Sequence, residues 1–194
     1  MSRRGFFLRW ISLLGGTMLR TFGMRYGVVP DRIAVERVRI EVDGLPPHLE
    51  GFTIGVLSDL HLGPLVREEF VRSAAEKLAA ERPNLVVVAG DLLSHHDYTK
   101  VVPGVLEPVQ GALAVLGNWD YYAGTPWFGT GLRWLINRGV EVAPGLWVAG
   151  VDDTLYGRPD LRQALAGGRG HCLVGSLTGA VASQRVTEAR DGSL

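Results

Sequence analysis

Residues 54–63 read IGVLSDLHLG, and the character of the chain changes halfway through them. The apolar and small residues that come first are typical of a strand that is buried on both faces. Asp59 and His61 follow at once, and side chains two positions apart can point toward one spot once the chain leaves a strand. Carboxylate and imidazole groups are common ligands of divalent metal ions. The stretch therefore predicts a buried strand that ends at a metal site.

Two later segments end in the same kind of residue. The run NLVVVAGDLL reaches Asp91, and the run ALAVLGNWD reaches Asn118 and Asp120. Taken alone, each of these residues would more often cap a helix or shape a turn. In a parallel α/β sheet, however, the carboxyl ends of the strands share one edge, where ligands bind. Three such strand ends in succession favour a single site formed by all of them.

The remaining sequence alternates between strand-like and helix-like patterns. In residues 36–42, ERVRIEV, charged and apolar side chains alternate, which predicts a half-buried strand. Residues 65–81 carry apolar side chains at helical spacing, and Pro83 ends that helix. We also expect a short helix or loop near residues 103–110, a helix in residues 127–139 closed by Gly139, and strands at VEVA and LWVAGV. This alternation predicts an α/β fold with parallel βαβ units.

Composition limits the classes of protein to be considered. A chain of 194 residues with 46% hydrophobic residues is expected to form one core. The 20 basic residues balance the 20 acidic ones, so nothing in the charge calls for a nucleic-acid partner. The single cysteine, Cys172, excludes a disulfide within the chain.

The basic charge is concentrated at the N-terminus. Residues 1–29 hold five arginines and no acidic residue, and MSRRGFFLRWISLLGG resembles a twin-arginine export signal. The charge-free run from Trp10 to Leu19 suits the apolar part of a signal but is shorter than the ~20 residues that span a bilayer. We expect export or a place at the cytoplasmic membrane. The alternative is a cytoplasmic protein whose basic, amphipathic N-terminal helix packs on the domain or touches a membrane surface.

Together, these motifs resemble those of a known family. SDLHLG, GDLL and GNWD, separated by 32 and 27 residues, are similar to the D-x-H, G-D and G-N-H-D blocks of the calcineurin-like metallophosphoesterases. The stretch VDGLPPHLEGFTIGVLSDLHLG and the later GVDD and GRPDL resemble the bacterial branch of exported or membrane-associated phosphodiesterases. The resemblance covers roughly residues 30–166. It implies a β-sandwich flanked by helices (αββα), with residues 1–29 as a separate segment and residues 167–194 as a divergent tail.

The resemblance also implies roles for single residues. It assigns Asp59 and His61 to one divalent ion, Asp91 to a bridge between two ions, and Asn118 to the second ion. The ions implied are Mn, Fe, Zn or Mg, and their chemistry is hydrolysis of a phosphomonoester or phosphodiester by metal-bound hydroxide. The substrate class implied is a phosphoester, lipid-linked or from the cell envelope. Asp120 corresponds to a catalytic residue that, in the family, steers a histidine.

We expect special backbone geometry at Gly63, Gly90 and Gly117, since glycine allows unusual φ angles or a close approach at a strand end.

The sequence departs from the family where the histidine of the third block is replaced by Trp119. An indole is a hydrogen-bond donor only and cannot act as a general acid near neutral pH. For Trp119 we weigh a hydrogen bond to a phosphoryl oxygen against a structural or substrate-stacking role.

The histidine blocks that the family carries after a strand like LWVAGV have no counterpart here. His171 lacks matching flanks, and we keep it as a weak candidate for a replacement ligand. His95 and His96 follow Asp91 and are further candidates, although loop histidines are more often solvated. His48 lies in a proline turn, and we expect it to be structural.

Three hypotheses follow from this mixture of features. The first is an active metal-dependent phosphoesterase. The second is a truncated, weakly active or inactive relative, produced by a shifted reading frame or a premature end after about codon 166. It would leave an open, aggregation-prone sheet edge beside residues 140–150. The third is a membrane-bound binding module in which Trp119 stacks on a ligand.

Overall fold

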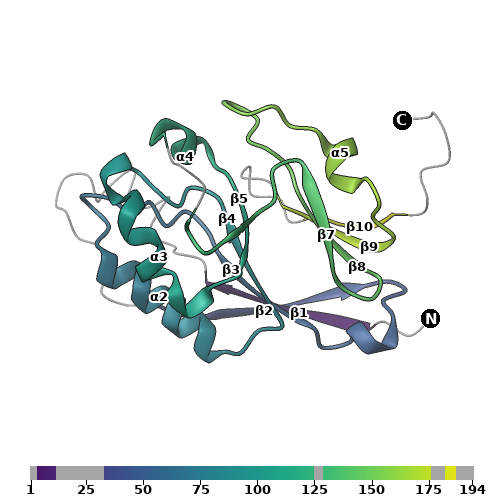
Figure 1. Ribbon diagram of the computed structural model, residues 1–194. Helices are drawn as coiled ribbons and strands as arrows, with labels where there is room; N and C mark the ends of the chain where they lie inside the picture. The colour runs from purple at the N-terminus through teal and green to yellow at the C-terminus, as the bar shows by residue number, and fades with distance from the viewer. Residues whose placement is uncertain (1–3, 12–32, 125–128, 176–181, 187–194) are drawn as a thin grey trace, which may run out of the picture.

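Two β-sheets pack face to face, with helices on their outer faces (Figure 1). The computed structural model describes residues 4–11, 33–124, 129–175 and 182–186. The first sheet has the order β2-β1-β3-β4-β5-β6, formed by β1 (Arg4–Ile11), β2 (Glu36–Val42), β3 (Thr53–Leu57), β4 (Leu85–Ala89), β5 (Leu113–Val115) and β6 (Arg133–Trp134). The second has the order β10-β9-β8-β7, formed by β7 (Arg138–Ala143), β8 (Leu146–Gly150), β9 (Gly170–Gly175) and β10 (Ala182–Val186).

The helices are short apart from one. The α-helices are α2 (Glu68–Ala80), α3 (Val102–Val105), α4 (Asn118–Tyr122) and α5 (Leu161–Leu165). Short 3-10 helices occur at η2 (Pro47–Leu49), η3 (His96–Val101) and η4 (Glu107–Val109). Helix α2 connects β3 to the parallel strand β4, which confirms the predicted βαβ unit.

The central strands of the first sheet are buried on both faces, which explains their continuous apolar runs. In β3, Ile54 and Val56 face the second sheet and pack near Leu146 of β8. Leu57 belongs instead to the core beneath α2, where Leu78 fills the space above Gly55. Because successive side chains of a strand point to opposite faces, one strand contributes to both cores.

The second sheet repeats this arrangement with a helix on its own outer face. Val115 of β5 packs with Val148 of β8 in the layer between the sheets. On the other side of β8, Ala149 packs against Ala164 of α5. Helices therefore cover both outer faces of the sandwich, which confirms the predicted αββα class.

The helix predicted over residues 127–139 is wrong. Within its described part the chain forms β6 and then enters β7, and Leu113 of β5 pairs with Arg133 of β6. The physical reason is the backbone: Gly129, Gly131 and Asn137 have φ angles of 87°, 77° and 51°. Left-handed residues at three positions exclude a continuous right-handed helix.

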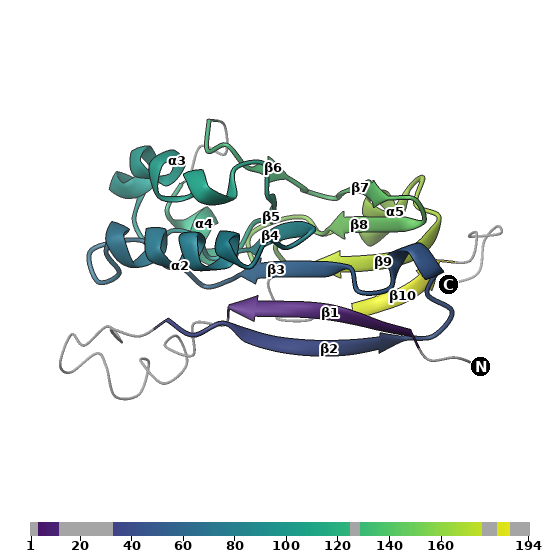
Figure 2. The same ribbon diagram turned by 90° about the horizontal axis from the view of Figure 1, so that it is seen from below.

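The alternative of an N-terminal helix is also wrong for residues 4–11, which the structure describes. Arg4–Ile11 form β1, which lies between β2 and β3 and runs parallel to β3 (Figure 2). Most of the charge-free run that suggested a signal falls in residues 12–32, outside the described residues. None of the helices in the described parts of the chain is long and apolar enough to cross a membrane.

We predicted an open sheet edge beside residues 140–150, and for β8 this prediction is wrong. Strand β9 pairs in parallel with β8 over five residue pairs, from Leu146 with His171 to Gly150 with Gly175. Strand β10 then pairs antiparallel to β9 (Figure 2). Within the described residues β7 is the outer strand on the opposite side of this sheet. The proposed segment boundaries at residues 29 and 166 stay predictions.

Candidate metal centre

Alternation between polar and buried residues shapes the loop after β3. Asp59 is exposed and His61 half-buried, whereas Leu60 and Leu62 lie in the core beneath α2. Burial of each leucine side chain stabilises this conformation of the loop by about 1.5–3 kcal/mol. The two leucines therefore keep the loop packed against the core. Their neighbours, Asp59 and His61, are thereby left on the side that faces away from the core.

Backbone hydrogen bonds join this loop to the one after β4. The Asp59 N–H donates to the Gly90 carbonyl oxygen at 3.2 Å, and the His61 N–H donates to the Asp91 carbonyl oxygen at 2.9 Å. The Leu62 N–H continues the pattern by donating to Leu92 at 2.9 Å. The parallel pairing of β3 and β4 thus continues past the strands and fixes the two loops side by side.

Three of the predicted ligands meet at this point. Asp59, His61 and Asp91 each offer one ligand atom, and these atoms lie within 4.8 Å of one another. His61 Nε2 is 3.7 Å from Asp91 Oδ2. The other oxygen of Asp91 accepts a hydrogen bond of 3.0 Å from the Trp119 backbone N–H. Asp91 is therefore held by one oxygen while its other oxygen lies toward His61.

The backbone at these ligands is strained. Asp59, His61 and Asp91 have φ angles of 53°, 47° and 50°, in the left-handed region that residues with a Cβ atom avoid. Such conformations cost of order 1–3 kcal/mol each and persist where the surrounding structure enforces them, often at functional sites. Here the bonds between the two loops provide that enforcement.

The glycines at the strand ends are only partly as expected. Gly90 has a φ of 78°, which confirms the need for glycine there. Gly117 has a φ of −111°, an ordinary extended value, so no unusual angle explains it. At Gly63 the constraint is space, because a Cβ atom would lie 3.2 Å from Ser94 Cβ.

The electrostatics of the cluster favour a cation. Burial raises the pKa of Asp91, and the negative charges of Asp59 and Asp153 raise it further. The Trp119 N–H and His61 act in the opposite direction. A divalent ion among these carboxylates would lower their pKa values and keep them ionised. Carboxylate and imidazole donors at this spacing therefore fit a divalent metal ion.

The fourth predicted ligand begins helix α4. Asn118 is half-buried, and its neighbour Trp119 makes the backbone bond to Asp91, so the start of α4 lies at the cluster. The Trp119 ring stands edge-on to His61, with ring centroids 5.6 Å apart, and contacts Tyr122 in the same way at 5.7 Å. The tryptophan therefore lies directly beside a predicted ligand.

Asp120 ties α4 to the loop after β4. One carboxylate oxygen accepts from the Leu93 N–H at 3.0 Å and the other from the Gly117 N–H at 2.9 Å. Burial raises the pKa of Asp120 to about 7, against the lowering effect of these hydrogen bonds. These contacts make Asp120 an anchor of the site, and its assignment as a catalytic residue stays a prediction.

Sequence reasoning missed the part played by the loop after β8. Asp152 accepts a hydrogen bond of 2.6 Å from the Tyr121 hydroxyl, which links this loop to α4. Asp153 is buried, and its carboxylate accepts from the Leu155 and Tyr156 N–H groups. The sequence contains a signal for this role, since Asp152 and Asp153 follow a buried strand just as Asp59 and Asp91 do.

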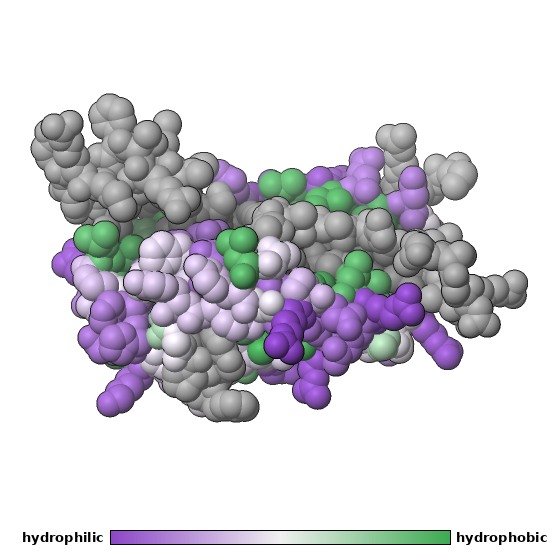
Figure 3. Space-filling model, turned by 90° about the horizontal axis from the view of Figure 1, so that it is seen from above, coloured by the Kyte–Doolittle hydropathy of each residue, from purple (hydrophilic) through white to green (hydrophobic). Residues whose placement is uncertain are grey.

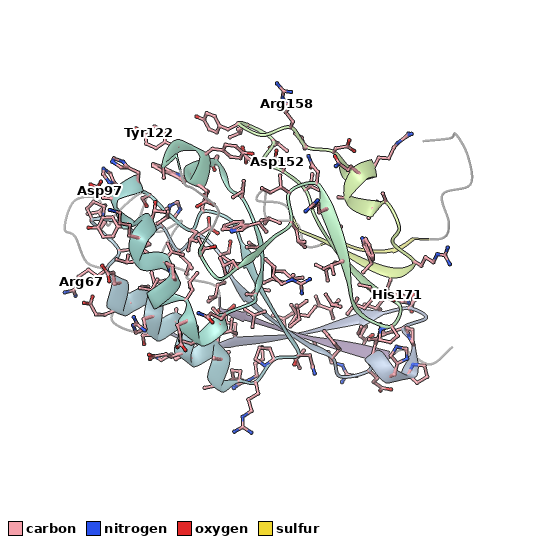
Figure 4. The ribbon with its side chains drawn as sticks, viewed as in Figure 1. Arg67, Asp97, Tyr122, Asp152, Arg158 and His171 are labelled. Carbon is pink, nitrogen blue, oxygen red and sulfur yellow. The ribbon has the colours of Figure 1, made fainter. Side chains whose placement is uncertain are left out.

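The remaining histidines do not join this cluster. His95 and His96 gather with Asp97 in a separate group. His171 lies in β9, well away from α4 (Figure 4), and its Nε2 atom is 3.1 Å from the Gly44 carbonyl oxygen. His48 Nε2 lies 2.7 Å from the Pro144 carbonyl oxygen, in agreement with the structural role expected for it.

The fold and site define a class: α/β proteins in which two sheets pack face to face and metal ligands gather where parallel strands end. Within that class, the chain belongs to the calcineurin-like phosphoesterase family, whose model matches residues 52–184. The match continues past residue 166 and includes β9.

Individual relatives support the same assignment. An uncharacterized metallophosphoesterase of Aquifex aeolicus (strain VF5) is 35% identical over 131 residues, which cover 63% of this chain and 50% of the relative. An uncharacterized metallophosphoesterase of Bacillus subtilis (strain 168) is 26% identical over 190 residues, which cover 86% of this chain and 65% of the relative. A transmembrane protein with metallophosphoesterase domain of Danio rerio is 29% identical over 116 residues, 58% of this chain and 26% of the relative. The matched region thus spans about half of the Aquifex protein and about a quarter of the Danio protein.

Proposed function

We propose that this protein hydrolyses a phosphomonoester or phosphodiester with the help of divalent metal ions. The observation that carries the proposal is the cluster of Asp59, His61 and Asp91, whose ligand atoms lie within 4.8 Å of one another. Family membership gives the reaction class. In this proposal Asp59, His61, Asp91 and Asn118 would hold two divalent ions.

Divalent ions held here would supply charge stabilisation at the phosphoryl group and promote ionisation of the attacking water. The chain's own residues orient the site, since the Trp119 N–H fixes one oxygen of Asp91 and the Tyr121 hydroxyl fixes Asp152. The indole of Trp119 cannot protonate a leaving group. In this proposal the leaving group takes its proton from water, and esters with acidic leaving groups are favoured.

Exposed hydrophobic side chains around the site support a substrate with an apolar part. Leu65 follows the loop that carries His61, Tyr122 lies on α4, and Leu155 and Tyr156 lie on the loop after β8; all four are more than 60% exposed. Figure 3 looks down on this side of the molecule and shows separate hydrophobic areas among polar ones. A lipid-linked or cell-envelope phosphoester combines the phosphate and apolar groups that such a surface can bind.

The N-terminal arginines support a place at, or beyond, the cytoplasmic membrane. Replacement of Arg3 and Arg4 by lysine is expected to reduce the membrane and extracytoplasmic fractions of the protein if twin-arginine transport delivers it. Cell fractionation measures this. Unchanged fractions would rule out that route, and adsorption through basic charge alone would instead weaken at high salt.

The experiment that tests the function combines metal binding with turnover. Mn²⁺ is expected to raise the melting temperature and to support hydrolysis of an aryl phosphoester, because binding to the folded state stabilises it. Asp91→Ala should lose both effects, whereas Asp43→Ala, at an exposed aspartate, should keep them. An equal melting-temperature gain in Asp91→Ala would contradict the metal centre.

The same experiment separates the proposal from the inactive relative, and a fluorescence measurement separates it from the binding module. Mn²⁺ stabilisation without turnover of any phosphoester would favour the inactive relative. The membrane-bound binding module, in which Trp119 stacks on a ligand, rests on the position of Trp119, which is only half-buried and lies beside His61 and Tyr122. That alternative predicts quenching of tryptophan fluorescence by an aryl phosphoester, without hydrolysis and with loss of quenching in Trp119→Ala.

A further inference from the structure

A second group of ligand atoms lies just after the loop that carries Asp91. His95, His96 and Asp97 each offer one ligand atom, and these atoms lie within 4.8 Å of one another. His95 Nδ1 is 3.4 Å from one oxygen of Asp97, and His96 Nε2 is 3.0 Å from the other. The two imidazole rings are stacked, with centroids 4.5 Å apart and planes 25° apart. One carboxylate therefore faces both imidazoles.

The local backbone explains why neighbouring side chains converge here. His95 is extended, with φ −151° and ψ 135°, and the chain turns at once into η3, so that His96 does not point to the opposite side as it would in a strand. The Asp97 N–H donates to the lone pair of His95 Nδ1 at 3.4 Å, a long hydrogen bond that a metal ion bound at this nitrogen would replace. A deprotonated imidazole nitrogen is the form that binds a metal ion.

The group is held in place on both sides. Before it, the Ser94 N–H donates to the Leu62 carbonyl oxygen and the Ser94 hydroxyl donates to the His61 carbonyl oxygen. After it, the Thr99 hydroxyl donates to the His96 carbonyl oxygen, and Tyr98 packs against the core. Less conformational entropy is lost on binding when the backbone is already ordered.

We propose that His95, His96 and Asp97 form a second metal site that binds a borderline transition ion such as Zn²⁺, independently of the phosphoesterase centre. Two imidazoles and a carboxylate suit Zn²⁺, Co²⁺, Ni²⁺ or Cu²⁺ better than Mg²⁺ or Ca²⁺. The side chains are 43%, 70% and 68% exposed, which leaves room for water in the remaining coordination positions. Figure 4 shows Asp97 at the surface, on the same side of the molecule as α2 and α3.

The test uses the full, untagged chain with Asp91→Asn, so that the phosphoesterase centre is weakened in every sample. Zn²⁺ affinity is measured by competition with a chromophoric chelator. The parent variant is expected to bind Zn²⁺. Adding His96→Ala or Asp97→Asn should weaken binding by about tenfold or more, as expected when one ligand is lost. Adding His48→Ala, at an exposed histidine elsewhere, should leave it unchanged.

The outcomes are decisive in both directions. Equal Zn²⁺ affinity in all four samples, no Zn²⁺ binding in the parent, or an equal loss in the His48→Ala control would each overturn the second site. Because Asp97→Asn keeps the size of the side chain and metal-free melting temperatures are compared, a loss of folding is distinguished from a loss of binding. Failure of the phosphoesterase proposal leaves this result unaffected, since no turnover is measured.

Discussion

At the scale of single residues, the candidate metal centre depends on backbone conformations that most side chains avoid. Asp59, His61 and Asp91 all have positive φ angles near 50°, and Gly90 precedes the third at 78°. A single aspartate at a strand end is ordinary, but here three predicted ligands on two hydrogen-bonded loops share this conformation. The bonds between the loops hold the donor groups close together, and binding of a cation, as proposed above, would offset the strain.

The backbone strain at Asp59 can be measured by substitution, because its side chain is exposed and removing it leaves no cavity in the core. Asp59→Ala and Asp59→Gly both remove the ligand, but only glycine adopts a φ of 53° without steric cost. The glycine variant should therefore be more stable than the alanine variant by about 1 kcal/mol, at the low end of the cost of left-handed geometry. Urea denaturation without added metal measures both variants. Equal stabilities would show that the loop relaxes and stores no strain.

At the scale of elements, the packing of α2 on β3 helps to set the position of the loop after β3, which carries Asp59 and His61. Leu78 of α2 lies over Gly55 of β3, and a Cβ atom at position 55 would come within 2.7 Å of a Leu78 methyl carbon. Asp120 sets the position of the loop after β4 relative to α4, because its carboxylate accepts hydrogen bonds from the backbone N–H groups of Leu93 and Gly117. Small changes in these contacts shift the loops that carry the ligands.

A double-mutant cycle tests the contact between α2 and β3. Gly55→Ala should destabilise the protein by about 1–3 kcal/mol through overpacking. Leu78→Ala should cost about 2–5 kcal/mol because Leu78 is fully buried. In the Leu78→Ala background the cost of Gly55→Ala should nearly vanish, since the clashing methyl groups are gone. Additive free energies of unfolding in the four proteins would refute the direct contact.

At the scale of the whole molecule, stability of the second sheet depends on strands that lie late in the sequence. Strand β8 contributes Val148 to the layer between the sheets and is covered on one edge by β9. An exposed strand edge invites pairing with other chains. The second sheet therefore needs β9 both for its own hydrogen bonds and for protection of β8.

A shortened chain tests this dependence. Ending the chain at residue 166 removes β9 and β10 and leaves one edge of Leu146–Gly150 without its partner strand. We expect a lower melting temperature and concentration-dependent light scattering. A matched chain that ends at residue 186 retains both strands and should behave like the full chain. If the chain ending at residue 166 stays monomeric with an unchanged melting temperature, the role assigned to β9 is wrong.

The sequence by itself determined the parts of the protein that depend on local pattern. Buried runs predicted β3, β4 and β5, and helical spacing predicted α2, because periodicity reflects which faces of an element are buried. The strand-end rule brought Asp59, His61 and Asp91 together, since parallel strands place their carboxyl ends on one edge.

Only the tertiary structure decided which distant segments pair. Backbone hydrogen bonds carry little sequence information, so nothing local places Arg4–Ile11 between β2 and β3, or β9 beside β8. The segment predicted as a helix after residue 127 became strand because left-handed residues interrupt it and β5 offers an edge for Arg133–Trp134. In the same way, His95 and His96 follow Asp91 in sequence, but the turn into η3 directs them to Asp97 and into a group separate from Asp59, His61 and Asp91.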